Sequence, residues 1–172
     1  SDGGSDVLRG GQGNDILQII DTDFSGTRRL QGGNGIDTLK LAGAGLHLDL
    51  TAIADNRIEE IEIIDITGSG NNTLTLNFRE VVNLSDHSNT LTVLRDAGDT
   101  VNIGSGWSNA GKVFEDGRFF DLFTQGATTL RVQDITVTID GDAATVLGTP
   151  GRDSIVYRVA QKQANVNGVN YV

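Results

Sequence analysis

The sequence predicts an all-β protein: a parallel β-roll, or β-solenoid, that is continued by degenerate turns and closed by an antiparallel β cap. Three observations support this fold class. Glycine supplies 23 of the 172 residues, about twice its usual share. Aspartate supplies 18 of the 23 acidic residues, and aspartate favours turns over helix interiors. Short apolar segments alternate with polar residues throughout the chain, as they do in strands.

A nine-residue pattern, G-G-x-G-x-D-x-U-x with U apolar, explains the first part of the chain. Residues 10–18 and 32–40 match it fully. Residues 1–9 match it with the first two glycines replaced, and residues 148–156 form a weaker fourth copy. The glycines of such a turn take backbone angles that other residues disfavour. We therefore expect a turn ending in Asp, followed by a short strand whose middle side chain faces the core.

Stacked turns of this kind bring backbone carbonyls and carboxylates to one spot. An all-oxygen cage suits Ca²⁺, which takes about six to eight oxygen ligands. Zn²⁺ prefers nitrogen and sulfur ligands, and the chain has only two His and no Cys. In a roll with two turns per coil, turns that share a metal lie about 18 residues apart. Asp15 and Asp37 are 22 residues apart, so the sequence pairs the turns at 10–15 and 32–37.

Three more carboxylates are candidate ligands by position. Asp21 and Asp23 lie in the enlarged half-turn between the two full repeats, on the edge where Asp6 should find a partner. Asp153 belongs to the weak fourth copy, where Thr149 and Pro150 depart from the pattern. The alternative for all these turns is a set of ordinary glycine-rich hairpins in which Asp is a turn residue.

Residues 41–104 are predicted to continue the solenoid with degenerate turns. Apolar strands recur every nine to eleven residues, for example at 81–84, 90–93 and 100–103, and Gly, Asn, Ser and Asp fill the linkers. An antiparallel β-sandwich would show similar spacing and is the main alternative. Residues 56–64 could also form a helical turn, because Ile58 and Ile61 are spaced for one helix face.

After Gly104 the composition changes, and we expect residues 105–147 to form the antiparallel cap. Asp116-Gly117 between apolar strands indicates a hairpin, and most aromatic residues of the chain lie at 107–123. A cap is expected because the open end of a solenoid would expose strand edges and core. An exposed aromatic binding patch is the alternative. Residues 148–172 contain the partial repeat and a polar C-terminal tail.

Composition also argues against several classes of function. A formal net charge of -10 disfavours nucleic acid and anionic membranes as partners. No apolar run reaches the roughly 20 residues of a membrane-spanning helix, so no membrane insertion is expected. The absence of Cys excludes disulfides and thiol chemistry. We find no G-x-S-x-G, Walker or H-E-x-x-H motif, and we expect no catalytic activity.

The two full repeats resemble the RTX, or hemolysin-type, calcium-binding repeats of proteins exported by bacterial type I secretion. Residues 58–74, 96–101 and 106–107 are similar to a segment of very large RTX surface proteins, many of them adhesins. The resemblance implies metal-ligand roles for the carboxylates of Asp15 and Asp37, and also for Asp6. It implies carbonyl ligands from four turn residues. These are Gly10, Gln12, Gly33 and Gly35.

The function implied by the resemblance is a calcium-binding structural or adhesive module of a secreted protein at the bacterial cell surface. Without calcium the acidic chain repels itself and stays unfolded for export, whereas calcium outside the cell links metal uptake to folding. We expect about one to three calcium ions, a cell-surface glycan or protein as ligand, and a monomeric fragment. The alternative is a C-terminal secretion and folding module of a type I-secreted hydrolase or epimerase.

Overall fold

The computed structural model describes residues 6–85 and 88–135 with their side chains, and the backbone of five short strands between residues 137 and 171. The described chain is mostly β, as the sequence predicts, with one α-helix, α1 (Phe78–Leu84), and one short 3-10 helix, η1 (Leu50–Ala52). The strands are β1 (Val7–Gln12), β2 (Ile16–Ile19), β3 (Arg29–Asn34), β4 (Thr38–Leu41), β5 (His47–Asp49), β6 (Ile58–Glu59), β7 (Ile63–Asp65), β8 (Thr73–Thr75), β9 (Thr90–Leu94), β10 (Thr100–Asn102), β11 (Ser108–Glu115), β12 (Arg118–Gln125), β13 (Thr128–Asp134), β14 (Val137–Asp140), β15 (Ala143–Val146), β16 (Ile155–Arg158), β17 (Gln163–Val166) and β18 (Val169–Tyr171).

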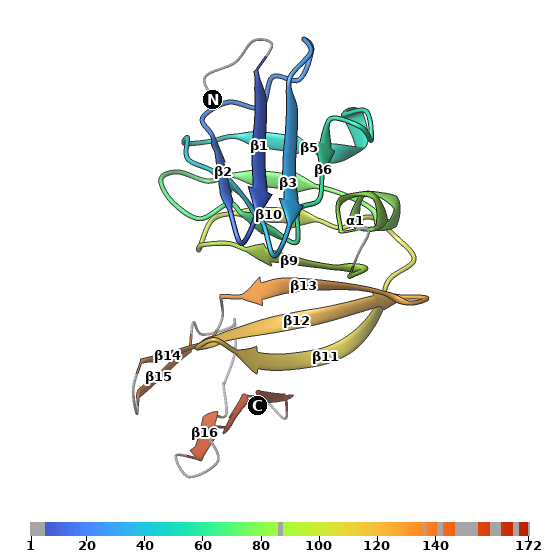
Figure 1. Cartoon of the computed structure of the whole chain (residues 1–172). Helices are drawn as coiled ribbons and strands as arrows, with labels where there is room; N and C mark the ends of the chain where they lie inside the picture. The colour runs from blue at the N-terminus through green and yellow to red at the C-terminus, as the bar shows by residue number, and fades with distance from the viewer. Residues whose placement is uncertain are drawn as a thin grey trace.

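The strands from β1 to β10 lie in three sheets whose neighbouring strands run parallel (Figure 1). Sheet A has the order β1-β3-β6, and sheet C has the order β10-β8-β5. Sheet B begins β2-β4-β7-β9 and continues through β13, β12 and β11. The chain runs through sheets A, B and C in turn and then returns to sheet A, and each such circuit is one pass. Each strand therefore pairs with strands of the neighbouring passes. Parallel pairing distinguishes this region from an antiparallel sandwich, the alternative that strand spacing left open.

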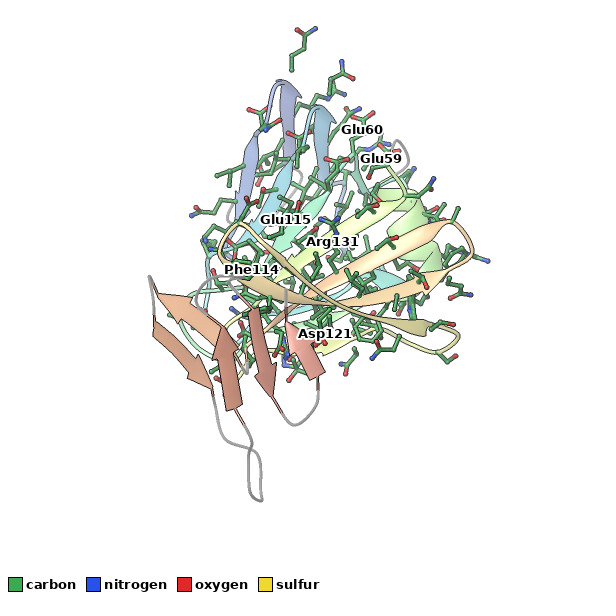
Figure 2. All side chains as sticks on the ribbon, turned by 90° about the horizontal axis from the view of Figure 1, so that it is seen from below. Glu59, Glu60, Phe114, Glu115, Asp121 and Arg131 are labelled. Carbon is green, nitrogen blue, oxygen red and sulfur yellow. The ribbon has the colours of Figure 1, made fainter. Side chains whose placement is uncertain are left out.

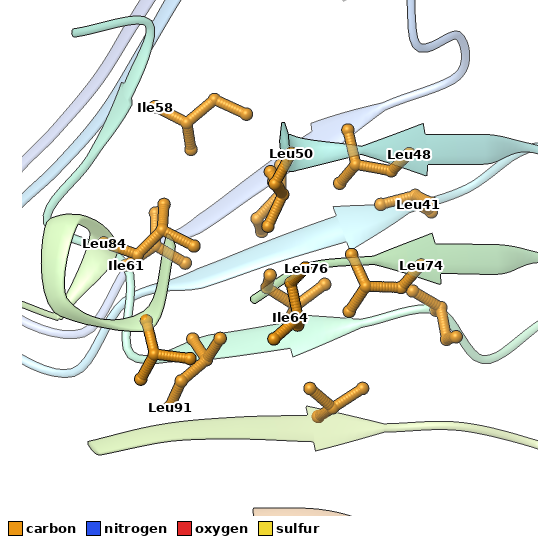
Figure 3. Packing of buried hydrophobic residues seen from close by; sticks show 14 of the residues in the cluster. Leu41, Leu48, Leu50, Ile58, Ile61, Ile64, Leu74, Leu76, Leu84 and Leu91 are labelled. Atoms are coloured by element: carbon orange, nitrogen blue, oxygen red, sulfur yellow. The ribbon is translucent and has the colours of Figure 1, made fainter. Parts of the chain in front are cut away.

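Equivalent residues of successive passes stack in columns that form the core. In sheet B, Leu17 pairs with Leu39, Leu39 with Ile64, and Ile64 with Val93, and all four side chains are buried. Because side chains alternate between the two faces of a strand, one face of each sheet turns inward (Figure 3). The buried apolar core consists of Leu17, Ile19, Leu30, Leu39, Leu41, Leu48, Leu50, Ile58, Ile61, Ile64, Ile66, Leu74, Leu76, Val81, Leu84, Leu91, Val93, Leu130 and Val132.

The fourth pass begins with α1 instead of a strand of sheet A. Asn77 caps the helix, because its side-chain oxygen accepts a hydrogen bond from Arg79 N at 2.7 Å. The sequence predicted a strand at residues 81–84, and this prediction was wrong. Valines favour strands, but the cap and the burial of Val81 and Leu84 on one helix face outweigh that preference here.

The helical turn considered for residues 56–64 is not found there. That segment holds β6 and β7 instead. Between these two strands Glu60 adopts a positive φ of 57°, and Ile61 is fully buried. The positive φ at Glu60 does not fit a right-handed helical turn, and Ile61 lies in the connection between β6 and β7.

β11, β12 and β13 form an antiparallel continuation of sheet B, which joins the parallel region through parallel pairing of β13 with β9. Asp116 and Gly117 make the tight turn between β11 and β12, with φ values of 50° and 76°. Two positive φ values are typical of a type I′ hairpin, so the predicted hairpin is confirmed. Arg131 of β13 forms a 2.6 Å ion pair with Glu115 of β11 (Figure 2). Among the described residues no helix is long and apolar enough to cross a bilayer.

Candidate metal centre

Three corners connect the sheets, and each is defined by the residues that directly precede equivalent strands. The AB corner precedes the strands of sheet B, the BC corner those of sheet C, and the CA corner the first two strands of sheet A. The strand registers place the members of each corner in adjacent passes. The members are Asp15, Asp37 and Glu62 in the AB corner, Leu46, Asn72 and Asp99 in the BC corner, and Asp6 and Arg28 in the CA corner.

The two full repeats stack directly on each other at the AB corner. Gly11 lies opposite Gly33, and Gln12 lies opposite Asn34. Gly13 N donates a hydrogen bond to Asn34 O at 2.8 Å, and Asn14 Oδ1 accepts one from Ile36 N at 3.0 Å. The turns at 10–15 and 32–37, which the sequence paired, are therefore neighbours in space. The four residues predicted to supply carbonyl ligands to the metal all belong to these stacked turns.

Close contact between the turns explains why the second repeat has glycine at position 33. Gly33 has φ of 110°, and a Cβ at this position would lie 2.1 Å from the carbonyl oxygen of Gly11. No side chain fits at such a distance. The stacking of one turn on the next thus requires glycine here for space as well as for backbone angle.

The acidic residues of the AB corner form a hydrogen-bonded column. Asp15 N donates to Asp37 Oδ1 at 2.7 Å, and Asp37 N donates to Glu62 Oε2 at 2.8 Å. Each carboxylate therefore binds the amide of the preceding pass. Asp37 is fully buried. The column extends the predicted pair by one residue, Glu62.

One oxygen of each aspartate remains without a hydrogen-bond donor. Asp15 Oδ2 and Asp37 Oδ2 are both buried, and no donor among the described residues reaches either atom. Each carboxylate folds back over the first glycine of its own turn: a Cβ on Gly10 would lie 2.8 Å from Asp15 Oδ2, and a Cβ on Gly32 would lie 2.7 Å from Asp37 Oδ2. Leaving a buried polar group unpaired costs about 1–3 kcal/mol, and more when it is charged. A cation bound to these oxygens would remove that cost.

The donor set at the AB corner fits a hard cation. It consists of carboxylate oxygens and the backbone oxygens of the stacked turns, which are the ligand types that Ca²⁺ prefers. Among the described residues no group of three or more His, Cys, Asp or Glu side chains is placed to hold a metal ion. Side chains alone would therefore not complete the coordination, and backbone carbonyls would have to supply much of it.

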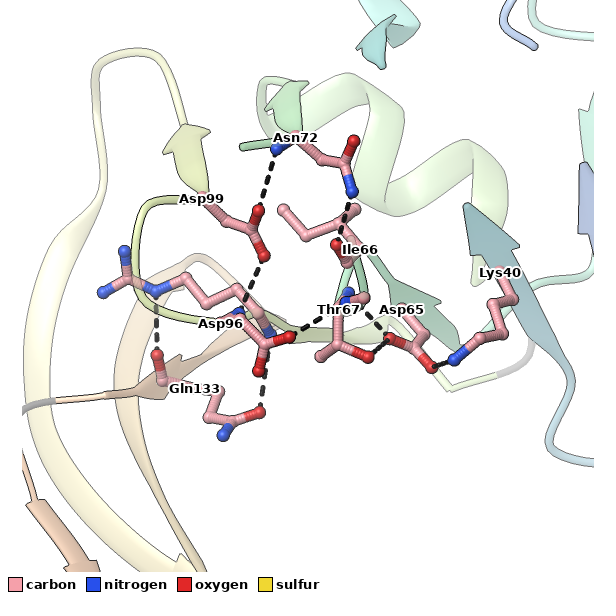
Figure 4. A network of polar contacts seen from close by, with 10 residues as sticks. Lys40, Asp65, Ile66, Thr67, Asn72, Asp96, Asp99 and Gln133 are labelled. Atoms are coloured by element: carbon pink, nitrogen blue, oxygen red, sulfur yellow. Dashed lines mark hydrogen bonds and ion pairs between the residues drawn. The ribbon is translucent and has the colours of Figure 1, made fainter. Parts of the chain in front are cut away.

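The BC corner has the same column but no unpaired carboxylate oxygen (Figure 4). Leu46 N donates to Asn72 Oδ1 at 2.8 Å, and Asn72 N donates to Asp99 Oδ1 at 2.8 Å. The second oxygen of Asp99 accepts a hydrogen bond from Asp96 N at 2.7 Å. Because both oxygens of Asp99 have donors, this corner is closed by hydrogen bonds, and the comparison singles out the AB corner as the candidate cation site.

The CA corner holds three further predicted ligands, Asp6, Asp21 and Asp23, near an arginine. Arg28 is fully buried and binds Asp21 through two hydrogen bonds of 2.8 Å and 2.9 Å. This guanidinium holds the pKa of Asp21 below its usual value. Asp23 is exposed, and its Oδ1 accepts a hydrogen bond from Ser25 N at 2.9 Å. The structure brings Asp21 and Asp23 to the CA corner, where Asp6 lies, and not to the AB corner.

Glu62 of the AB corner and Arg28 of the CA corner were not predicted from the sequence. Asp153, which was predicted, lies outside the described residues. Glu62 directly precedes the strand residues Ile63-Ile64, just as Asp37 directly precedes Thr38-Leu39. An acidic residue directly before a strand is the signal for Glu62, and a search for the glycine consensus does not detect it. Arg28 lies 22 residues after Asp6, the same interval that separates Asp15 from Asp37. Applying that interval to Asp6 would have placed an arginine at the CA corner.

A groove of about 380 Å³ lies on the outer side of sheet B, beneath the β11–β12 hairpin. Its lining includes apolar Ile63 and Leu94, the hydroxyl of Thr92, and the ion pair of Glu115 with Arg131. This mixture identifies no single class of ligand. Comparison of the chain with protein-family models, with curated proteins and with solved structures finds no match.

Proposed function

We propose that this chain is a calcium-binding structural module of a secreted bacterial surface protein of the RTX type, which folds outside the cell as calcium binds. The observation that carries the proposal is the AB corner. Two full repeats stack there, and two buried carboxylate oxygens, Asp15 Oδ2 and Asp37 Oδ2, have no donor among the described residues.

In this proposal the parallel region is a β-solenoid and the antiparallel strands are its cap. Support comes from the repeated order of sheets A, B and C and from the in-register columns of core residues. β12 and β11 cover the edge of β13 that a further pass would otherwise occupy. The cap protects that edge from pairing with other chains.

The AB corner would act as a switch through its own residues. Asp15 and Asp37 would hold the ion together with carbonyls of Gly10, Gln12, Gly33 and Gly35. A bound ion would supply positive charge to two carboxylates that each have one oxygen without a donor among the described residues. Without it, repulsion within a chain of net charge -10 favours the unfolded state required for export, and calcium outside the cell reverses that balance. The module serves as a spacer or adhesive unit and has no catalytic role.

The proposal is tested by isothermal titration of the calcium-free chain with Ca²⁺, using Asp37→Asn as the key variant. Asn has nearly the same shape and can still accept the hydrogen bond from Asp15 N, so the change removes mainly charge. We expect calcium affinity to fall at least about tenfold, or 1.4 kcal/mol. The control is Asp116→Asn in an exposed turn with φ of 50°, a conformation that Asn tolerates. Equal calcium binding by wild type and Asp37→Asn would refute the assignment of this site.

A further inference from the structure

The CA corner contains a positive charge supplied by the chain itself. Strand register places Asp6 beside Arg28, because Val7 pairs with Arg29. In the AB corner the equivalent neighbours are the two aspartates, Asp15 and Asp37. The second pass therefore carries an arginine at one corner and an aspartate at the next, each directly before a strand.

Arg28 lies in surroundings that a bound cation would also require. Its side chain is fully buried, and it makes a two-pronged ion pair with Asp21 from the loop at residues 20–28. Its guanidinium also lies over the ring of Phe24, with Cζ 5.3 Å from the ring centroid. The carboxylates of Asp21, Asp6 and Asp23 all raise the pKa of Arg28, with the hydrogen bonds to Asp21 contributing most. Asp21 thus contacts the buried guanidinium directly, and Asp6 and Asp23 add negative charge near it.

We propose that the guanidinium of Arg28 takes the place of a calcium ion at the CA corner. This corner then forms without metal, and within the described passes only the AB corner depends on calcium. The inference rests on the proposed function, since it treats the two corners as versions of one site. A guanidinium suits the role because it stays charged at all relevant pH values and presents a fixed fork to a carboxylate. Unlike a bound ion, it cannot dissociate when calcium is low.

Arg28→Asp tests this assignment, because it restores at the CA corner the residue type found at the AB corner. Without calcium the variant lacks the guanidinium that pairs with Asp21 and places a further carboxylate at this corner. We expect its Tm in a calcium chelator to fall by about 6–20 °C relative to wild type, as for the loss of one partner of a buried ion pair. Millimolar Ca²⁺, and not Mg²⁺, should restore most of this loss. Calorimetric titration should show about one more calcium ion per chain than in wild type.

The matched control is Arg29→Asp, which changes the net charge equally at the next position. Arg29 is exposed and contacts Glu59 at 3.8 Å, so this variant should gain no calcium ion. If Arg28→Asp fails to fold even with calcium, Arg28→Gln decides the question. It removes the charge and keeps a hydrogen-bonding side chain, and calcium should raise its Tm by more than it raises that of wild type.

The inference is overturned if neither Arg28 variant responds to calcium more strongly than wild type and Arg29→Asp do. Failure of the proposed function gives a different result. In that case wild-type chain takes up no calcium at the AB corner, and the comparison between Arg28→Asp and Arg29→Asp still reports on the CA corner. Calcium binding by wild type therefore reports on the AB corner. The difference in calcium response between Arg28→Asp and Arg29→Asp reports on the CA corner.

Discussion

The two oxygens of the Asp37 carboxylate lie in different environments at the AB corner. Oδ1 accepts a hydrogen bond from Asp15 N, which orients the side chain. Oδ2 is buried and meets no donor among the described residues. One oxygen therefore fixes the position of the other, and in the proposed function that second oxygen is the one that binds the cation. A cation or an ordered water at Oδ2 would complete the contacts of this carboxylate.

Gly33 and Gly11 offer a matched pair for testing whether the turns stack as described. Both have φ of 110°, so an alanine at either position costs about 1–2 kcal/mol in backbone strain. Only at Gly33 would the new Cβ meet the neighbouring turn; at Gly11 nothing among the described residues lies within 4 Å. Gly33→Ala should cost about 1–3 kcal/mol more than Gly11→Ala, measured by urea denaturation. Equal costs would show that the turns do not contact each other.

The stacking of Asp15 on Asp37 could be predicted from the sequence because glycines mark their turns at a fixed spacing. Glu62 could not, because the turn before it is shorter and Glu60, not glycine, takes the positive φ. The cationic CA corner was missed for a similar reason. Asp6 matches the repeat, but its neighbour in the second pass is Arg28, which no ligand consensus contains.

At the scale of elements, side chains on the outer faces of the strands also link successive passes. Lys40 of β4 forms a 2.7 Å ion pair with Asp65, its neighbour on β7 (Figure 4). Thr67 donates two hydrogen bonds to the other carboxylate oxygen, from its amide at 2.9 Å and its hydroxyl at 2.6 Å. Burial raises the pKa of Asp65, but Lys40 and Thr67 together hold it below its usual value of 3.8.

This lowered pKa predicts a pH dependence of stability. A carboxyl group with a lower pKa in the folded state stabilises the fold above its unfolded pKa and loses that contribution as the pH falls through its folded pKa. Asp65→Asn should therefore lower the free energy of unfolding by about 1 kcal/mol at neutral pH. The difference from wild type should shrink as the pH falls below 3.8. Urea denaturation across this range, with Asp116→Asn as the control for lost charge, checks it. A difference that stayed constant to about pH 2 would contradict this account.

Most strands could be predicted from the sequence, whereas the helix could not. Strands such as β4 and β9 show clear alternation of apolar and polar residues, and their inward residues form the core columns. α1 occupies a place where earlier passes have a strand, and its valines resemble those strands locally. Only the cap at Asn77 and the tertiary contacts of Val81 and Leu84 favour the helix. Local sequence cannot reveal that choice, because it depends on what the helix packs against.

Across the whole molecule, the same column of residues before a strand is stabilised in three different ways. The BC corner uses hydrogen bonds to both oxygens of Asp99. The CA corner uses the ion pair between Arg28 and Asp21. The AB corner has carboxylate oxygens that only an added cation or water would satisfy. In the proposed function this difference makes one corner sensitive to calcium while the rest of the core can form by apolar packing.

Thermal unfolding of the chain, followed by circular dichroism in a calcium chelator, in millimolar Ca²⁺ and in millimolar Mg²⁺, tests calcium-linked folding most directly. Binding to the folded state alone at about 100 times Kd adds about 2.7 kcal/mol per site. Calcium-linked folding therefore predicts a cooperative transition in calcium with a Tm at least about 5–10 °C above that in chelator or magnesium. Superimposable transitions under all three conditions would show that the repeats are structural turns and would contradict the proposed function.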